Sequence, residues 1–354
     1  MDVPAIAVTG ASGLVGQRLL PLLAEHPEVA RVVALDVREP DWRSRRVEFH
    51  RIDIAGTQLK PLLEGVDVVV HLAGVVDPIL DEALMARVNV DGTRHVLAAA
   101  ASVGARRFVR ISSSTVYGAW PDNPVPLTED MPLRPNPHFS PAVQGAEVER
   151  LIAEWRAEQP GVTVTTLRSA PVVGPGAERL PARILLGRPP LRVRGAAPPV
   201  QVVHVDDLAA ALALVSTADL PGVYNVAADG WLDAGAARSL LPRTSAPAVP
   251  EDVLERALRR SWGLGLGEIP PGVVPYLVHP WVIANDRLKG AGWMPTRSNE
   301  EAIAEALDAL PPRTSIRTRV IGGAVAVATL LAVVRIRRRR RAKRAHMVAA
   351  DADA

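Results

Sequence analysis

The chain has 354 residues, 48% of them hydrophobic, with no cysteine and a formal net charge of +3. This length can bury a large core and favours one two-lobed unit over a string of small modules, while the lack of cysteine excludes disulfide bonds and thiolate chemistry. We expect no secretory signal peptide, because the opening residues MDVPAIAV contain neither a basic region nor a long apolar one.

The positive charge lies near the C-terminus. Residues 335–344 (RIRRRRRAKR) contain 8 of the 41 Lys and Arg residues, so residues 1–334 have 33 basic against 36 acidic side chains, a net charge of −3. A mildly acidic body argues against a nucleic-acid-binding face on the folded part of the chain, and we expect no nucleic-acid partner.

The first predicted strand, residues 5–9, leads into the glycine-rich sequence TGASGLVG and then into a helical pattern over residues 13–26. Gly10 suits a tight turn, Gly13 lets the backbone approach a pyrophosphate, and Gly16 lets the helix pack on the strand. The free N–H groups at the helix N-terminus would bind the phosphates. This pattern predicts the βα unit of a dinucleotide-binding fold.

A second apolar strand, residues 31–36, ends in Asp36, 20 residues after Gly16. An acidic side chain at this place would accept hydrogen bonds from both ribose hydroxyls of NAD and repel the 2′-phosphate of NADP. Arg38 weakens that preference slightly. The sequence therefore predicts NAD as the cofactor, with NADP as the less favoured alternative.

Apolar runs continue to alternate with helical patterns along the chain. Strands are predicted near residues 47–51, 66–71, 107–112 and 162–167, and helices near residues 81–103 and 142–158. This alternation predicts parallel strands joined by right-handed crossovers, which is a doubly wound α/β sheet of the Rossmann type. Ligands of such sheets bind beyond the carboxyl ends of the strands. Polar residues gather there: Asp36, Asp53, His71 and 112–115.

After Pro171 the pattern breaks into segments rich in proline and glycine, such as GRPPLRVRGAAPPV. We expect residues 1–171 and 204–228 to form the NAD-binding domain. Residues 172–203 and 229–310 would form a smaller substrate lobe that covers the cleft. Residues 311–354 would be a linker, a short apolar helix and an arginine-rich tail.

Several motifs occur in an order that is similar to the extended short-chain dehydrogenases/reductases, the NAD-dependent epimerase/dehydratase family. This family includes UDP-galactose 4-epimerase and the 3β-hydroxysteroid dehydrogenases, and the resemblance covers roughly residues 1–310. The matching motifs are TGASGLVG, Asp53-Ile54, HLAG at 71–74, NVDGT at 89–93, SSSTVYG at 112–118, VVGPG at 172–176, HVDDLA at 204–209 and DRLKGAGWMP at 286–295.

The glycine turn, the end of the second strand and the resemblance together assign a cofactor site. Its residues are Thr9, Gly10, Ser12, Gly13, Leu14, Val15, Gly16, Asp36, Arg38, Asp53, Ile54, Leu72, Ala73, Gly74, Asn89, Pro171 and Val172.

The resemblance also implies an active-site hydroxyl on the SSSTVYG strand. Ser113 stands four residues before Tyr117 and is the matching position, and Thr115 is a second candidate. A hydroxyl of this kind would hold the substrate oxygen. The alternative for both residues is a hydrogen bond to neighbouring backbone.

The family further supplies a tyrosine as proton acceptor and a lysine four residues later that holds the ribose, but no Tyr-x-x-x-Lys occurs in this sequence. Two alignments of the helix near residues 142–158 place either Phe139 and Val143 or Pro141 and Gly145 at these positions. Loss of general acid–base catalysis typically costs about 10²- to 10⁴-fold in rate. Ordinary turnover is therefore expected to be very slow.

Other residues are candidates for proton transfer or for substrate binding. His138 is a candidate acid or base, with a surface position at a helix start as the alternative. Tyr117 has no lysine to lower its pKa. Arg168, Arg192 and Arg194 could hold a nucleotide-sugar diphosphate or be solvated loop residues. The substrate is expected to be a small molecule, either a nucleotide sugar or sterol-like.

Metal and nucleophile chemistry are not predicted. The eight histidines show neither H-x-x-x-H nor H-E-x-x-H spacing, and no G-x-S-x-G sequence occurs.

Residues 320–334 are 15 uncharged residues, which as a helix would span roughly 22 Å, short of a hydrocarbon layer of roughly 30 Å. We expect residues 320–344 to lie on an anionic membrane surface in the cytoplasm. The alternatives are a membrane span, in which the bilayer thins or the bordering arginines snorkel, and a buried core helix. Ala324, Ala328 and Ala332 would support pairing of two helices, hence a homodimer.

The leading hypothesis is a membrane-associated NAD-binding protein of this family with a degenerate active site: a weak or unconventional oxidoreductase, or a cofactor-binding sensor or scaffold. The alternative is a working epimerase, dehydratase or hydroxysteroid-type dehydrogenase with a substitute acid or base. An anchored nucleic-acid-binding adaptor would fit the basic tail but not the acidic body.

Overall fold

A parallel β-sheet forms the centre of the molecule. The computed structural model describes residues 3–177, 180–186, 191–241 and 248–310. Seven strands follow the order β3-β2-β1-β4-β5-β6-β9, and every neighbouring pair is parallel. This confirms the predicted doubly wound α/β fold. The strands are β1 (Ala5–Thr9), β2 (Arg31–Asp36), β3 (Val47–Arg51), β4 (Val68–His71), β5 (Arg107–Ser113), β6 (Thr163–Ser169) and β9 (Gly222–Val226).

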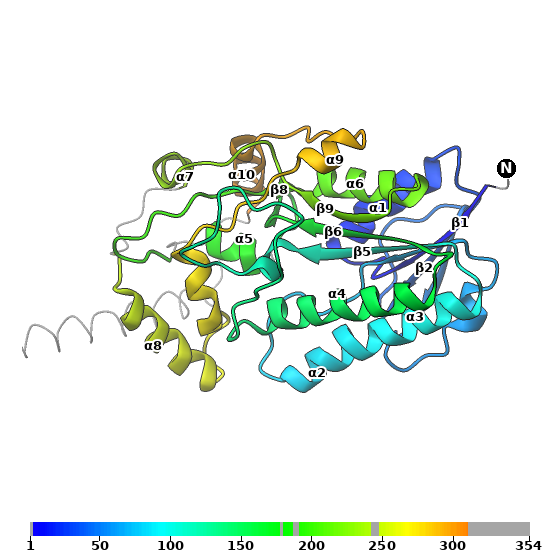
Figure 1. Cartoon of the computed structure of the whole chain (residues 1–354), viewed down its shortest axis with the longest axis horizontal. Coiled ribbons are helices and arrows are strands. Elements are labelled where there is room, and N and C mark those ends of the chain that lie inside the picture. Colours follow the sequence, from blue (N-terminus) through cyan, green and yellow to red (C-terminus); the bar gives the residue numbers. More distant parts are fainter. Residues whose placement is uncertain (1–2, 178–179, 187–190, 242–247, 311–354) are drawn as a thin grey trace, which may run out of the picture.

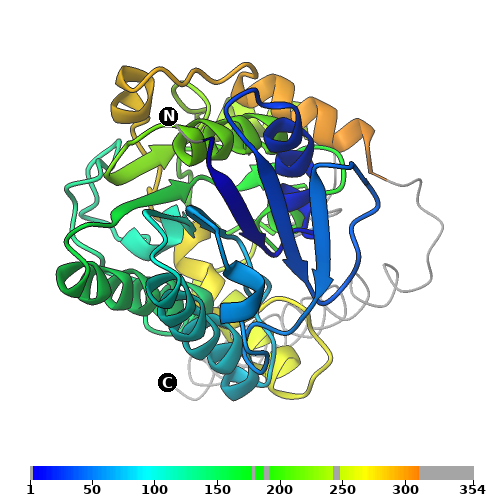
Figure 2. The same cartoon turned by 90° about the vertical axis from the view of Figure 1, so that its right-hand side faces the viewer.

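Helices cover both faces of the sheet. Helices α1 (Leu14–Glu25) and α6 (Val205–Thr217) pack together on one face, and α3 (Gly92–Ser102) and α4 (Ser140–Glu158) lie on the other (Figures 1 and 2). A sheet covered on both faces needs strands that are apolar on both sides, and all five residues of β1 are buried. The continuous apolar runs in the sequence correspond to these buried central strands.

The chain order of the strands creates a crevice. From β1 the sheet continues to β2 on one side and to β4 on the other, with connections on opposite faces. In such a fold, ligands bind outside the carboxyl ends of the strands at this switch point.

The segment predicted as one helix near residues 81–103 is continuous but not uniform. It consists of α2 (Glu82–Ala86), a wide π-type turn η2 (Arg87–Asp91) and α3. Two short 3₁₀ helices, η1 (Lys60–Leu63) and η3 (Ser114–Tyr117), follow β3 and β5. Single π-type turns inside helices often occur at functional sites.

The later segments gather at the carboxyl end of the sheet, where Figure 1 shows α5, α7 and α8 beyond the strand ends. Strands β7 and β8 pair in parallel, α9 packs against β9, and α10 packs against α7. The division into two domains predicted from the sequence stays a prediction. These elements are β7 (Val172–Val173), α5 (Leu180–Leu185), β8 (Val203–His204), α7 (Ala234–Leu240), α8 (Glu251–Gly263), η4 (Pro271–Leu277), α9 (Asp286–Gly290) and α10 (Asn299–Asp308).

Among the described residues, no helix combines the length and the apolar character that crossing a bilayer requires. Residues 320–344, on which the predicted membrane contact and helix pairing depend, lie outside the described ranges.

Candidate functional site

The glycine turn after β1 lies directly against the loop that follows β4. Gly10 has a φ of +72°, and a Cβ atom on it would stand 2.6 Å from the backbone nitrogen of Ala73. A Cβ on Gly16 would stand 2.5 Å from the carbonyl oxygens of Gly10 and Ala11. Helix α1 begins here without a side-chain cap and without an acidic residue in its first turn. The turn therefore offers free N–H groups to an anion and fits a pyrophosphate.

A cleft of about 550 Å³ extends from this turn over the ends of the strands. Every predicted cofactor residue lines it apart from Thr9 and Ser12. The predicted residues that line the cleft are Gly10, Gly13, Leu14, Val15, Gly16, Asp36, Arg38, Asp53, Ile54, Leu72, Ala73, Gly74, Asn89, Pro171 and Val172.

Thr9 and Ser12 do not line the cleft but form hydrogen bonds within the fold next to it. Thr9 Oγ1 lies 2.7 Å from His71 Nδ1, and His71 Nε2 lies 2.9 Å from Thr93 Oγ1. Burial, together with the charge of Arg110, holds the pKa of His71 well below its ordinary value. His71 is thus a neutral bridge inside the fold. Ser12 donates its hydroxyl to the carbonyl oxygen of Arg38.

Asp36 is held in place by two backbone groups at the end of β2. Its Oδ2 accepts a hydrogen bond from the N–H of Ser12 at 3.0 Å, and its Oδ1 accepts one from the N–H of Arg38 at 3.0 Å. These bonds fix the carboxylate at the rim of the cleft, where it can still accept further hydrogen bonds because each oxygen has two lone pairs.

Asn89 connects three parts of the cleft wall from within the π-type turn. Its Oδ1 accepts a hydrogen bond from the N–H of Val75 at 2.7 Å. Its Nδ2 donates to the carbonyl oxygen of Val75 at 3.1 Å and to Gln144 Oε1 at 3.0 Å. The loop after β4 and helix α4 are therefore fixed relative to each other. Gln144 was not predicted, because its only signal is its place on the helix.

Hydroxyl groups gather where β5 ends. Thr115 Oγ1 donates to Ser113 Oγ at 3.0 Å, and both residues line the cleft. Ser114 Oγ is buried and has no hydrogen-bond partner in the described part of the chain. Ser112 Oγ instead donates to Glu149 Oε1 at 2.6 Å. Ser114 was not predicted as a site residue, although it belongs to the run of hydroxyl-bearing residues at the end of β5.

Helix α4 presents no proton-transfer group to the cleft. The α4 residues Pro141, Gln144, Gly145 and Val148 line it, together with Phe139 at the N-cap, and none of these side chains titrates. Val143 is not among the lining residues.

The three tyrosines direct their hydroxyl groups elsewhere. Tyr117 donates to Asn225 Oδ1 at 2.8 Å, and burial raises its pKa to about 12. Tyr224 donates to the carbonyl oxygen of Pro221 at 3.3 Å. Tyr276 donates to the carbonyl oxygen of Thr115 at 2.8 Å, and burial raises its pKa as well.

His138 is exposed and lines neither the cleft nor the second cavity described below. Within the described ranges, no three His, Asp or Glu side chains come together as metal ligands would.

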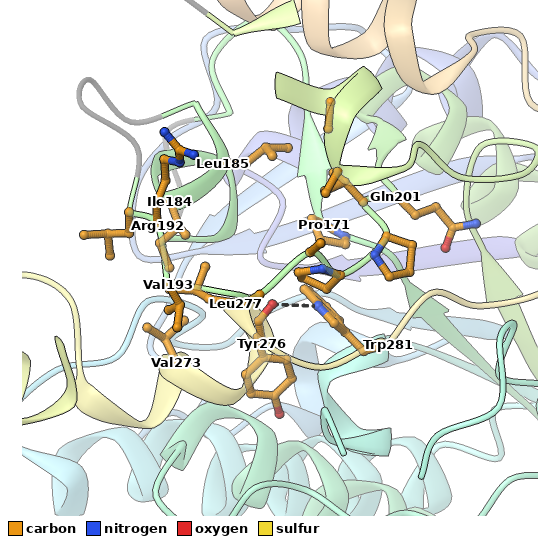
Figure 3. Close-up of a pocket in the computed structure, with 18 of the residues that line it drawn as sticks. Pro171, Ile184, Leu185, Arg192, Val193, Gln201, Val273, Tyr276, Leu277 and Trp281 are labelled. Atoms are coloured by element: carbon orange, nitrogen blue, oxygen red, sulfur yellow. Dashed lines mark hydrogen bonds between the residues drawn. The ribbon is translucent and has the colours of Figure 1, made fainter. Parts of the chain in front are cut away.

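A second cavity of about 460 Å³ joins the cleft on the side of the C-terminal elements (Figure 3). The two spaces share the lining residues Thr115, Phe139, Ala170, Pro171 and Leu180. Most of the remaining lining is apolar, and its aliphatic part comprises Ile184, Leu185, Leu191, Val193, Val200, Leu241, Val273, Leu277 and Val282.

Two cations, Arg192 and Arg238, line this cavity, and both are exposed. Of the three arginines predicted as candidate diphosphate ligands, only Arg192 lines this cavity. Arg168 is buried in an ion pair with Glu149, and Arg194 is exposed and outside the lining. No periodic pattern predicts this cavity, because its walls come from short segments that are far apart in the chain.

Arg110 is a further residue that the motifs did not single out. It stands on β5 and lines the cleft, and its Nη1 donates to the carbonyl oxygen of His71 at 3.4 Å. Its signal in the sequence was a charged residue inside the otherwise apolar run FVRI, residues 108–111.

Comparison with known proteins identifies relatives of this chain. The model of the NAD dependent epimerase/dehydratase family matches residues 6–227. An uncharacterized protein of Mycobacterium tuberculosis is 32% identical over 241 residues, which are 64% of this chain and 63% of that protein. The chain thus spans less than two thirds of the length of this relative. A 3-diazoavenalumate denitrifying reductase of Streptomyces sp is 27% identical over 320 residues, 82% of this chain and 96% of that protein.

The fold is also similar to solved structures. UDP-glucuronic acid 4-epimerase from Bacillus cereus, in complex with NAD, superimposes with a TM-score of 0.66 at 20% identity. The superposition covers 86% of this chain and 98% of the epimerase. At this identity the likeness shows the fold.

Proposed function

The chain belongs to the NAD dependent epimerase/dehydratase family, within the extended short-chain dehydrogenases/reductases, and from this premise we propose how its site works. It binds NAD in the cleft but lacks the family's Tyr-x-x-x-Lys dyad. It is therefore a weak or unconventional oxidoreductase, or a cofactor-binding sensor or scaffold.

Support for the cofactor comes from the turn around Gly10 and Gly16, where any Cβ would collide with backbone. The same turn leaves the N–H groups at the start of α1 free for a pyrophosphate. Asp36 at the end of β2 favours NAD over NADP, since a carboxylate repels a 2′-phosphate. When bound, the nicotinamide would supply or accept a hydride.

The observation that carries the proposal is the face that α4 turns to the cleft. Gly145 lies four residues after Pro141, and both line the cleft, whereas in the other alignment Phe139 lines it but Val143 does not. This geometry favours the alignment in which proline and glycine replace tyrosine and lysine. With all three phenols bonded elsewhere, no phenol is available to take the proton from a substrate hydroxyl.

The second cavity favours a substrate with an apolar body. Its lining is mainly aliphatic and aromatic, and it opens beside Thr115, next to the place where hydride transfer would occur. A sterol-like molecule matches this lining better than the hydroxyl-rich sugar of a nucleotide sugar does. Arg192 could bind one anionic group at the rim. The Streptomyces relative that is matched over 96% of its length is a reductase by its name.

A second candidate function is a working dehydrogenase or epimerase with a substitute acid or base. One observation favours it: Ser113, Ser114 and Thr115 cluster where the two spaces meet, and Ser114 Oγ lacks a hydrogen-bond partner in the described part of the chain. An unpaired buried hydroxyl is costly and needs a reason.

Titration of NADH fluorescence tests cofactor binding. Wild type should bind, and Gly16→Ala should bind at least about tenfold more weakly, since its Cβ displaces the phosphate-binding turn. Gly56→Ala is the matched control, because nothing lies within 4 Å of the added Cβ. Equal affinity of all three proteins for NADH would contradict this cofactor site.

Turnover separates the two candidate functions. Oxidation of sterols and epimerisation of UDP-sugars should be at least about 100-fold slower than for a family member that has the dyad. Brisk turnover that falls sharply in Ser113→Ala or Ser114→Ala would support the substitute-acid alternative and contradict the leading proposal.

A further inference from the structure

Arg110 occupies the centre of the sheet, where charged side chains are rare. In the register of β5 it lies opposite His71 on β4 and Thr166 on β6. It shares a face of β5 with Ser112, because alternate residues of a strand point the same way. Ser112 bonds to Glu149 of α4, so Arg110 points toward the layer of α4 and reaches the cleft from below that helix.

Arg110 is half-buried, and its guanidinium has few hydrogen-bond partners in the described part of the chain. Its Nε is buried and has no hydrogen-bond partner in the described part of the chain. Its one hydrogen bond there, from Nη1 to the carbonyl oxygen of His71, is long at 3.4 Å. Burial lowers its pKa to about 10, so the side chain is still a cation at neutral pH.

The acidic group whose charge acts on Arg110 is already engaged elsewhere. Glu149 Oε2 accepts from Arg168 Nη2 at 2.6 Å and Nε at 3.0 Å, and its Oε1 accepts from Ser112 at 2.6 Å. Arg168 therefore neutralises most of the charge of Glu149, and within the described ranges Arg110 has no ion pair of its own. A cation at a cleft wall is unfavourable when its hydrogen bonds are left incomplete. This cost is understandable if a ligand completes its hydrogen bonds.

The position along the cleft indicates which part of a dinucleotide would meet Arg110. Asp36 marks the adenosine end over β2, and the glycine turn after β1 marks the pyrophosphate. In the sheet order, β4 and β5 lie on the other side of β1. A dinucleotide that crosses the switch point would place its second ribose there. Gly145 of α4 lines this part of the cleft and contributes no side chain.

We propose that Arg110 binds the hydroxyl groups of the second ribose, on the nicotinamide side of the cofactor, so that the cation of this site comes from strand β5 instead of from helix α4. The inference rests on the proposed binding of NAD. Arg110 lies outside the family motifs. Its cation would take the place of the lysine that this chain lacks where Gly145 lines the cleft.

Isothermal titration calorimetry with three ligands tests this contact. ADP carries the adenosine and both phosphates, ADP-ribose adds the second ribose, and NADH adds the nicotinamide. Arg110→Met should weaken ADP-ribose and NADH about 10- to 100-fold, the effect of hydrogen bonds to a charged group, and change ADP by less than about twofold. Arg110→Lys, which keeps the charge, should weaken ADP-ribose less than Arg110→Met does.

Unchanged binding of ADP also shows that the variant is folded. Arg150→Met, an exposed arginine on α4, is the matched control and should bind all three ligands as wild type does. If wild type binds NADH and Arg110→Met binds ADP-ribose equally well, Arg110 has no such role although NAD binding stands. If wild type binds neither NADH nor ADP, the proposed function and this inference are both overturned.

Discussion

Arg168 and Glu149 form an ion pair in the interior, with Nη2 and Oε2 2.6 Å apart and each side chain 6% exposed. Arg168 also donates to the hydroxyl of Tyr117 at 2.8 Å, and its guanidinium lies 4.8 Å from the centre of that ring. The pair connects β6 to α4 one turn beyond Gly145. It therefore holds the helix that forms one wall of the cleft.

Replacing Glu149 with glutamine should lower the free energy of unfolding by about 3–5 kcal/mol, because it leaves the guanidinium of Arg168 buried without a countercharge. Denaturation by urea measures this change. Glu147→Gln is the control, since Glu147 lies on the same helix and has no ion pair in the described part of the chain; it should change stability by less than about 0.5 kcal/mol. Similar values for the two variants would show that the pair does not anchor α4.

The free energy of unfolding should decrease as the pH falls below neutrality, because His71 stays neutral in the folded chain. Its pKa in the folded chain lies well below the ordinary value of 6.5, chiefly because of burial. As the pH falls below 6.5, the unfolded chain takes up a proton that folded His71 does not, so the unfolded state is favoured. The loss approaches about 1.4 kcal/mol per pH unit until the lowered pKa is reached.

Urea denaturation at about pH 7.0 and pH 5.5 measures this dependence. His71→Gln keeps a polar bridge between Thr9 and Thr93 but cannot titrate, so its stability should vary less over this range than that of wild type. The exposed His138→Gln should vary as wild type does. An unchanged slope in His71→Gln would mean that other groups cause the loss at low pH.

The sheet could be predicted from the sequence because its strands are continuous apolar runs, such as VVAL in β2 and AIAV in β1. The cofactor turn could be predicted because its glycines are required by close backbone contacts, which leave a fixed spacing. Both are local signals. The second cavity has no such signal, since Leu191, Val273 and Trp281 meet only after the chain has folded.

The register of α4 was ambiguous for a related reason. Both Glu147 and Glu149 fitted the acidic position of the motif, and the periodicity of the helix could not separate them. In the structure, Glu149 is buried against Arg168, whereas Glu147 is half-exposed. Arg168 lies 19 residues away in the sequence. A long-range ion pair of this kind leaves no trace in the helical pattern, so the sequence alone could not distinguish the two acidic residues.

Filling the second cavity should block an apolar ligand and spare the cofactor. Leu277→Trp adds a bulky ring to a half-buried lining position. Binding of an apolar fluorophore with one anionic group, such as anilinonaphthalene sulfonate, should weaken about tenfold or more, while the affinity for NADH stays within about twofold.

Leu266→Trp is the matched control for this experiment. Leu266 is 70% exposed and lies outside the cavity, so this variant should bind the fluorophore as wild type does. Equal fluorophore binding by Leu277→Trp and wild type would show that the apolar ligand binds elsewhere on the protein.

A phenol at position 141 should restore proton transfer. Pro141 lines the cleft at the first turn of α4, so Pro141→Tyr would place a hydroxyl where the helix now has none. Arg110 lines the same cleft, and its cation would lower the pKa of that phenol because it favours the phenolate. We expect NAD-dependent oxidation of the best sterol-type or other secondary alcohol substrate to rise about 100-fold, measured by NADH absorbance.

Pro141→Phe carries the same ring without the hydroxyl and should leave the rate at the level of wild type. Adding Arg110→Met to Pro141→Tyr should shift the rise of the rate to higher pH, because the phenol then loses the cation that lowers its pKa. If Pro141→Tyr and Pro141→Phe oxidise the substrate equally slowly while both bind NADH, a missing phenol on α4 does not limit this protein.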